Sequence, residues 1–93
     1  MNPKKKLAGL HTKLLGNNQR VMRVSGQKVR ALRIEECMTQ VELAQAAKLT
    51  PKFISKVENN DDWRLMATVK KLGRALHVKI AELQVDEEEA AEA

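Results

Sequence analysis

Two helix-start signals stand eleven positions apart in the middle of this 93-residue chain. Residues 39–42 read Thr-Gln-Val-Glu, a capping box in which the threonine hydroxyl and the glutamate carboxylate each accept an amide hydrogen. Residues 50–51 read Thr-Pro, an N-cap followed by a proline at the first helical position, where no amide hydrogen is needed. The spacing predicts helices over Gln40–Ala47 and Pro51–Asn59, joined by a turn at residues 48–49. The residues predicted to face inward are Leu43, Ala44 and Ala47 in the first helix and Ile54 and Val57 in the second. Two short helices with a tight turn form a helix-turn-helix.

The segments on either side of this motif carry apolar residues at helical spacing. A first helix is predicted from residue 27 to about Cys37, with Val29 and Leu32 on one face. A fourth helix is indicated by apolar residues spaced four, three and four apart. These are Leu65, Val69, Leu72 and Leu76. Residues 78–83 fit a short fifth helix, although the apolar alternation at their start also permits a strand.

Composition agrees with helices packing on helices. The chain has two aromatic residues, Phe53 and Trp63, so its core must be largely aliphatic. We therefore predict an all-α fold, a five-helix domain over residues 26–84 with the helix-turn-helix at its centre.

Charge is divided between the two ends of the chain. Within a net charge of +5, residues 1–34 hold nine Lys or Arg and no acid, and residues 82–93 hold six acids and no base. We expect residues 1–25 to form a flexible basic arm with a short helical stretch over 7–15, although residues 20–24 alternate weakly and permit an extended segment. Residues 85–93 are expected to be a disordered acidic tail. Such a tail solubilises the protein, binds a partner or masks the basic face.

Several function classes are excluded. A single cysteine, Cys37, rules out an internal disulfide and fits a reducing compartment. No apolar run approaches the ~18 residues that a membrane helix needs, and the basic start lacks the apolar stretch of a secretory signal. We expect a cytoplasmic protein without a membrane association. No metal-ligand spacing, nucleophile–base set or phosphate-binding loop is visible, so we predict no enzyme activity, no metal and no cofactor.

At this point the chain resembles a known family. Residues 39–44 read Thr-Gln-x-x-Leu-Ala, and Ile54-Ser55, Glu58-Asn59 and Ala75-Leu76 follow at matching places. Over residues 26–83 the chain resembles the Cro and phage-repressor helix-turn-helix regulators, the XRE family. The resemblance implies a recognition helix over Pro51–Asn59 in the major groove.

The resemblance also implies roles for individual residues. Gln40 would contact a phosphate, while Thr50, Lys52 and Lys56 would reach base edges or phosphates with help from Ser55. Pro51 offers only apolar contact, for example to a thymine methyl group. Glu58 would serve the structure rather than readout. Three lysines in the arm would wrap DNA, or else remain a solvated terminus. These are Lys4, Lys5 and Lys6.

Three departures from the family pattern stand out. Lys48 occupies the turn position where the family usually has glycine. The loop over residues 60–63, Asn-Asp-Asp-Trp, is acidic where the family loop is often basic, and acids facing phosphates would weaken binding. This loop resembles that of HipB-type antitoxins. Finally, Pro51 replaces the polar residue that many members use for base readout.

We therefore expect a sequence-specific regulator of transcription that binds double-stranded DNA, a repressor acting as a homodimer on an inverted repeat. The dimer contact is expected at residues 78–85 or at residues 21–24. Trp63 fits equally a dimer contact or a cap on the core beside the fourth helix. The alternative is an antitoxin that binds a toxin or other protein partner and autoregulates its operon.

Overall fold

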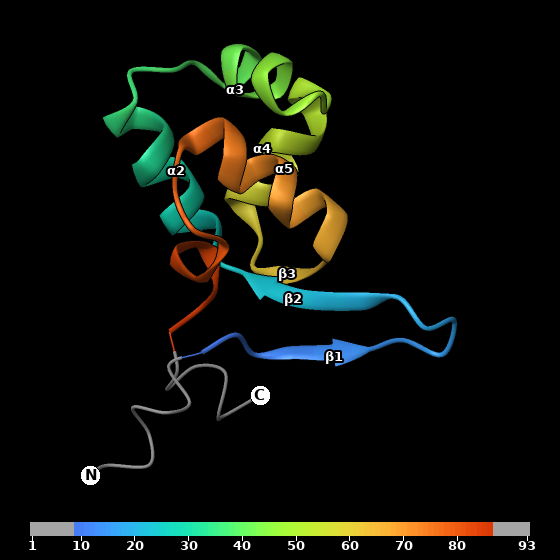
Figure 1. Cartoon of the computed structure of the whole chain (residues 1–93). Helices are drawn as coiled ribbons and strands as arrows, with labels where there is room; N and C mark the ends of the chain where they lie inside the picture. The colour runs from blue at the N-terminus through green and yellow to red at the C-terminus, as the bar shows by residue number, and fades with distance from the viewer. Residues whose placement is uncertain (1–8, 87–93) are drawn as a thin grey trace, which may run out of the picture.

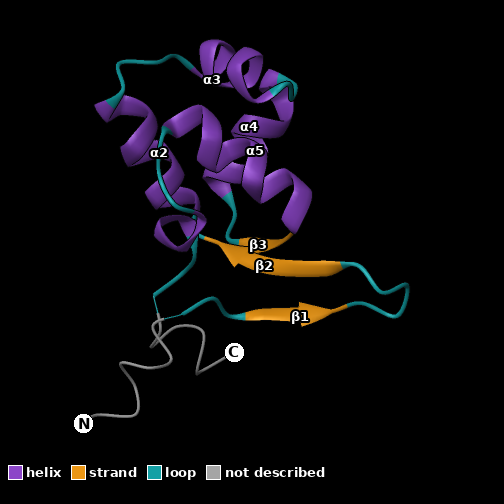
Figure 2. Cartoon of the chain, in the orientation of Figure 1, coloured by secondary structure: helices purple, strands orange, loops and turns teal. Residues whose placement is uncertain are grey.

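The computed structural model describes residues 9–86 of the chain. In it, helices gather at one end and a three-stranded sheet lies at the other (Figures 1 and 2). The elements, in chain order, are β1 (Thr12–Leu14), β2 (Arg20–Val24), α2 (Gly26–Glu35), α3 (Gln40–Ala47), α4 (Pro51–Asn59), β3 (Asp62–Leu65), α5 (Met66–Leu76) and the 3-10 helix η1 (Ile80–Leu83).

The two central helices begin where the sequence predicts. At α3, the Glu42 amide donates to the Thr39 hydroxyl at 3.0 Å, and the Thr39 amide donates to the Glu42 carboxylate at 2.8 Å. At α4, the Phe53 amide donates to the Thr50 hydroxyl at 3.1 Å, and a proline occupies the first turn. The capping box and the threonine cap are thus confirmed.

Lys48 makes the turn between α3 and α4 without a glycine. It has φ 58° and ψ 44°, the left-handed conformation that ends α3, and the Leu49 amide donates to the Ala44 carbonyl at 2.8 Å. A left-handed residue with a Cβ costs about 1 kcal/mol. The family geometry is therefore kept at a modest cost in stability.

The prediction of an all-α, five-helix fold is wrong. The structure holds a three-stranded antiparallel sheet in the order β1-β2-β3, in which Val21 lies opposite Leu65 and Val24 opposite Asp62. Leu65, expected on the fourth helix, ends β3 instead and is 39% exposed. The expected fifth helix is the four-residue 3-10 helix η1. The fold is α+β.

The segment expected as a flexible arm contributes to this sheet. The suggested extended run is strand β2, whereas residues 12–14, expected to be helical, form strand β1. β1 and β2 make an antiparallel hairpin that projects beyond the helices (Figure 1). The lysine run 4–6 and the tail residues 87–93 lie outside the described residues.

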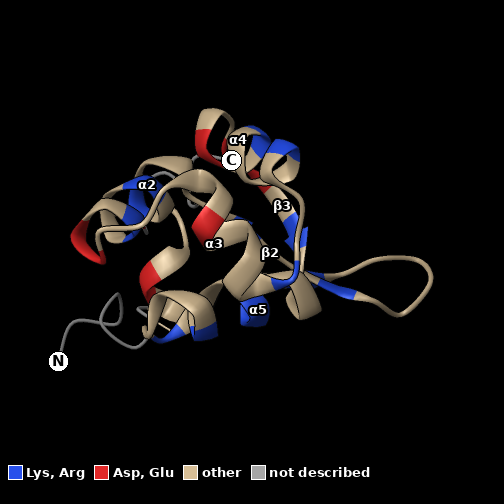
Figure 3. Cartoon of the chain, turned by 90° about the horizontal axis from the view of Figure 1, so that it is seen from above, with Lys and Arg blue, Asp and Glu red and all other residues tan. Residues whose placement is uncertain are grey.

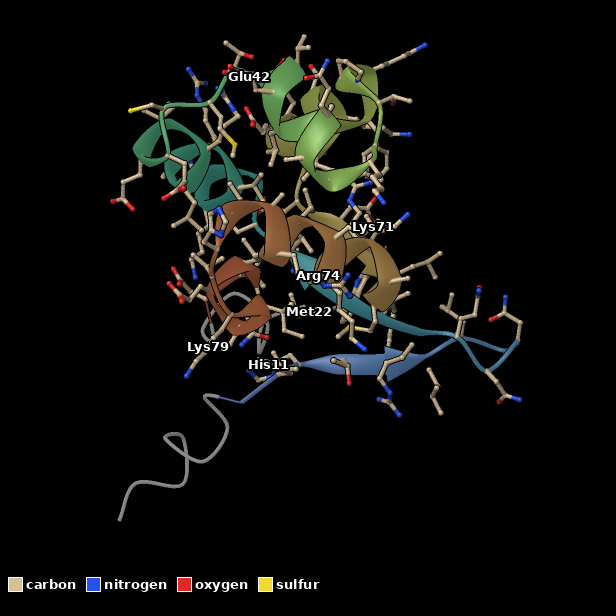
Figure 4. The ribbon with its side chains drawn as sticks, turned by 45° about the horizontal axis from the view of Figure 1, so that its top comes forward. His11, Met22, Glu42, Lys71, Arg74 and Lys79 are labelled. Atoms are coloured by element: carbon tan, nitrogen blue, oxygen red, sulfur yellow. The ribbon has the colours of Figure 1, made fainter. Side chains whose placement is uncertain are left out.

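The core lies between the helices and the inner face of the sheet. Met22 of β2 is fully buried, and it lies between the sheet and α5 (Figure 4). The residues predicted to face inward on α3 and α4 are buried. They are Leu43, Ala44, Ala47, Ile54 and Val57. The core cluster is aliphatic, with Phe53 packed at its edge, which confirms the expectation from composition.

The segment after η1 ties the two ends of the described chain together. The Val85 amide donates to the Arg23 carbonyl at 3.2 Å, which adds a short stretch of pairing beside β2. The Gln84 side chain donates to the Gly9 carbonyl at 3.0 Å and accepts from the His11 amide at 2.9 Å. Lys28 of α2 donates to the Gln84 carbonyl at 2.8 Å. The start of the hairpin is thereby fastened to the helical body.

Candidate nucleic-acid interface

The outward face of α4 carries the predicted contact residues. Pro51, Lys52 and Lys56 are exposed, while Ile54 and Val57 on the opposite face are fully buried. Residues four apart on a helix lie one above the other, so the two lysines form one cationic row. The row is fixed in orientation because the buried face cannot rotate out of the core.

Two hydroxyl groups flank this row, and both already make local hydrogen bonds. The Thr50 hydroxyl accepts from the Phe53 amide, and the half-buried Ser55 hydroxyl accepts from the Asn59 side chain at 3.3 Å. A hydroxyl that accepts can still donate its own hydrogen. Both groups therefore remain able to donate to a phosphate or to a base acceptor.

A buried ion pair holds α4 in place. The Arg33 guanidinium of α2 donates to the Glu58 carboxylate of α4, with Nε at 2.6 Å and Nη2 at 3.1 Å. The two side chains are only 12% and 3% exposed. Arg33 Nη1 also donates to the Met38 carbonyl at 2.8 Å. The structural role that the resemblance implied for Glu58 is confirmed.

Hydrogen bonding to Glu58 raises the pKa of Arg33 above its usual value, although burial opposes this effect. The ion pair therefore favours the charged form of the guanidinium. Sequence reasoning missed Arg33, because nothing in the local pattern pairs it with a residue 25 positions later.

Gln40 joins the same cluster from the first turn of α3. Its Nε2 donates to Glu58 Oε1 at 3.1 Å. An amide nitrogen carries two hydrogens and the amide oxygen accepts separately, so one donor of Gln40 remains beyond this bond. The single carboxylate of Glu58 thus connects α2, α3 and α4, and it fixes Gln40 and the lysine row relative to each other.

The acidic loop after α4 has a structural use. The Asp61 carboxylate accepts from the Gly26 amide at 2.8 Å, at the first residue of α2, where a negative charge complements the helix dipole. Gly26 packs so closely on α4 that a Cβ there would lie 2.5 Å from the Val57 carbonyl oxygen. The Asp62 carboxylate accepts from the Trp63 amide at 2.7 Å. This departure from the family pattern therefore follows from local packing.

Strand β3 supports the other flank of α4. Arg64 is 8% exposed, and its guanidinium carbon lies 5.4 Å from the centroid of the Phe53 ring of α4. Trp63, one residue earlier, is half-buried, with the Lys13 ammonium of β1 at 4.1 Å from its ring centroid. α4 is thus held by the Arg33–Glu58 ion pair, and Arg64 of β3 contacts it at the Phe53 ring.

Other elements of the molecule also carry cations. Seen from the end of the molecule that carries α3 and α4, Lys and Arg lie on α2, α4, β3 and α5 (Figure 3). Exposed members of this set include Arg30 of α2 and Lys71 and Arg74 of α5. Among residues 9–86, no three His, Cys, Asp or Glu side chains come together to hold a metal ion. None of the helices in this part of the chain has the length and apolar character needed to cross a membrane.

Comparison with protein families matches residues 29–83, more than half of the chain, to a family described as helix-turn-helix. The chain belongs to the XRE family of helix-turn-helix proteins. It is therefore a DNA-binding transcription regulator. Since this family consists of regulators rather than enzymes, the prediction of a non-enzyme is confirmed. β1 and β2 lie outside the matched residues.

Solved structures of similar fold include other regulators. The restriction-modification controller protein C.AhdI from Aeromonas hydrophila is 28% identical, with a TM-score of 0.58 over 61% of this chain and 86% of that one. The hypothetical transcription factor NHTF from Neisseria is 24% identical, with a TM-score of 0.61 over 72% of this chain and 77% of that one.

SinR, the master regulator for biofilm formation, solved in complex with DNA, is 23% identical, with a TM-score of 0.54 over 61% of this chain and 95% of that one. At these identities NHTF and SinR show a shared fold. A search of curated protein sequences gives no significant match.

Proposed function

We propose that this XRE-family protein is a sequence-specific repressor that binds double-stranded DNA with α4 in the major groove. The observation that carries the proposal is the rigid cationic row of Lys52 and Lys56 on a helix whose other face is fully buried. The major groove admits an α-helix, and base edges there present a distinct pattern for each base pair. Because the opposite face of α4 is buried, both lysines leave the helix on the same side and can approach such a pattern together.

The remaining predicted contacts complete this proposal. Gln40 would donate its second amide hydrogen to a phosphate, while Thr50 and Ser55 would donate their hydroxyl hydrogens. Pro51 would add apolar contact near the start of α4. The arm lysines, Lys4, Lys5 and Lys6, would contact phosphates beside the site.

We also propose that the protein binds as a homodimer on an inverted repeat, because one short recognition helix contacts only a few base pairs. Of the two regions considered, β2 is the central strand of its sheet and both its edges are paired. Residues 78–85 keep partly exposed apolar side chains at Val78 and Ile80. These favour residues 78–85 as the contact between protomers.

The antitoxin alternative is less favoured. Its main sequence support was the acidic loop, and Asp61 in that loop caps α2. A toxin or other protein partner is therefore not needed to explain these acids.

Selection of bound duplexes from a random pool tests the function. We expect an enriched inverted repeat whose half-sites are centred about 34 Å apart, one helical turn of DNA. Absence of any enriched sequence would contradict sequence-specific readout. A bound species shown by mass measurement to hold one protomer per operator would contradict the dimer.

The Lys52→Ala variant tests readout by α4. We expect affinity for the selected site to fall by about 1–3 kcal/mol and the preference at one base pair per half-site to relax. The side chain is exposed, so the fold should survive. Arg30→Ala, an exposed cation on α2, is the matched control and should leave every base preference unchanged. Unchanged affinity and preference in Lys52→Ala would place the recognition surface elsewhere.

Salt dependence tests the phosphate contacts. If about six Lys or Arg neutralise phosphates in each bound unit, the logarithm of the association constant should fall against the logarithm of the salt concentration with a slope of about −5. Removal of residues 1–6 should flatten the slope by up to about 3 if the arm lysines bind phosphates. A slope near zero for the full chain would rule out this binding mode, and an unchanged slope after truncation would show that the arm takes no part.

A further inference from the structure

An open groove of about 550 Å³ lies between α5 and η1. Gly73, Val78 and Ile80 contribute its small and apolar lining, and Lys70, Arg74 and Lys79 contribute cations. All three cations are exposed. Figure 4 shows Arg74 on α5 and Lys79 just before η1. None of these residues belongs to the lysine row on α4.

The shape of the groove follows from how α5 ends. His77 has φ 60° and closes α5 in a left-handed conformation, so the chain turns back beside the helix. Gly73 permits this close return, since a Cβ there would lie 3.1 Å from the Val78 carbonyl oxygen and 3.2 Å from Ile80 Cγ2. The side chains of Val78 and Ile80 remain half-buried. Apolar surface therefore stays open between cations.

We propose that the acidic C-terminal tail, residues 87–93, binds in this groove of its own molecule. The tail reads Glu-Glu-Glu-Ala-Ala-Glu-Ala, with four carboxylates to meet the three cations and alanines small enough for the apolar lining. Glu82 is the only acidic residue among those that line the groove. Charge and size are thus complementary.

The tail begins five residues after the groove residue Glu82 in the chain. Asp86, the last described residue, is held by an ion pair of 2.7 Å with Lys28, and it follows the groove residue Glu82 by four positions. Seven extended residues span at most about 25 Å, which is a large part of the 40 × 32 × 20 Å molecule. Exposed ion pairs are individually weak, but a tethered segment acts at an effective concentration in the millimolar range.

A paramagnetic label on the tail tests the proposal on the full chain. Cys37 is an exposed free thiol, so the label is placed in a Cys37→Ser, Ala93→Cys protein. At low salt we expect amide signals of Arg74, Val78 and Ile80 to broaden, and the broadening to decrease in high salt because screening weakens exposed pairs. Arg74→Gln should lower the occupancy of the groove about twofold, in line with the loss of one exposed pair.

Two controls and one alternative outcome decide the result. Arg30→Gln removes an exposed cation of α2 and should leave the broadening unchanged. Broadening at Lys52 and Lys56 instead would place the tail on the recognition helix and overturn the proposal. A mixture of isotope-labelled unmodified protein with unlabelled tagged protein should show no broadening, and broadening there would mean that the tail reaches a second copy.

A consequence that rests on the proposed dimer concerns residues 78–85. If two copies meet there, the tail and the second copy compete for the same surface. Replacing the four tail glutamates with glutamine should therefore strengthen dimerisation by a few-fold, as measured by sedimentation. Glu35→Gln with Glu36→Gln, two exposed acids at the end of α2, is the matched control and should leave it unchanged. The label experiment detects the tail in the groove whether or not the protein dimerises. Its result therefore does not depend on the proposed dimer.

Discussion

Replacing Glu58 with alanine is expected to lower the free energy of unfolding by about 3–5 kcal/mol, the range for breaking one partner of a buried ion pair. The change leaves the Arg33 guanidinium, 12% exposed, without its carboxylate, and it also removes the acceptor for Gln40. Urea unfolding followed by circular dichroism measures the loss. Asp86→Ala is the matched control, because it breaks the exposed pair with Lys28 and should cost less than about 1 kcal/mol.

A double replacement separates charge burial from packing. Arg33→Met with Glu58→Leu removes both buried charges, so it should recover most of the stability lost in Glu58→Ala. DNA affinity need not recover with it, since Gln40 would still lack its anchor. If Glu58→Ala lowered the free energy of unfolding no more than Asp86→Ala does, the hydrogen bonds of Glu58 with Arg33 and Gln40 would not stabilise the fold.

Replacing Ile54 with alanine is expected to cost about 2–5 kcal/mol, the range for a large-to-small change in a core. Ile54 is fully buried on the inner face of α4, so the cavity would open directly beneath this helix. Thermal and urea unfolding measure the effect. Ile34→Ala offers the same chemical change at a side chain that is 55% exposed, and it should stay within about 0.5 kcal/mol. Equal losses in the two variants would contradict the assigned core.

Both predictions depend on how firmly α4 is held against the rest of the fold. Under the proposed function, the outward lysines of α4 can read DNA only if the inward face is immobile, and that face is held by Ile54 and Val57 below and by Glu58 at its edge. A variant that loosens either support should weaken sequence preference more than it weakens the salt-dependent, non-specific affinity. Binding to the selected duplex and to a scrambled duplex at matched salt measures this difference.

The sequence by itself determined the helix-turn-helix. Thr39, Glu42 and Thr50 act within three residues of their hydrogen-bond partners, and the apolar spacing assigned the inward faces of α3 and α4. Contacts between residues so close in the chain can be predicted from a short stretch of sequence. The outward positions of Lys52 and Lys56 likewise followed from the motif and its family pattern, whereas the sequence did not say that Lys48 adopts the left-handed conformation.

Only the tertiary structure decided the sheet and the contacts that brace α4. β3 is four residues long and pairs with a strand about forty positions earlier. Its sequence between α4 and α5 therefore looked like a loop and the start of a helix. Arg33 with Glu58, Asp61 with Gly26 and Gln84 with Gly9 are likewise far apart in the chain. A buried polar group must find a partner, but a single sequence does not say which one, because that choice is made by the packing of the helices and the sheet.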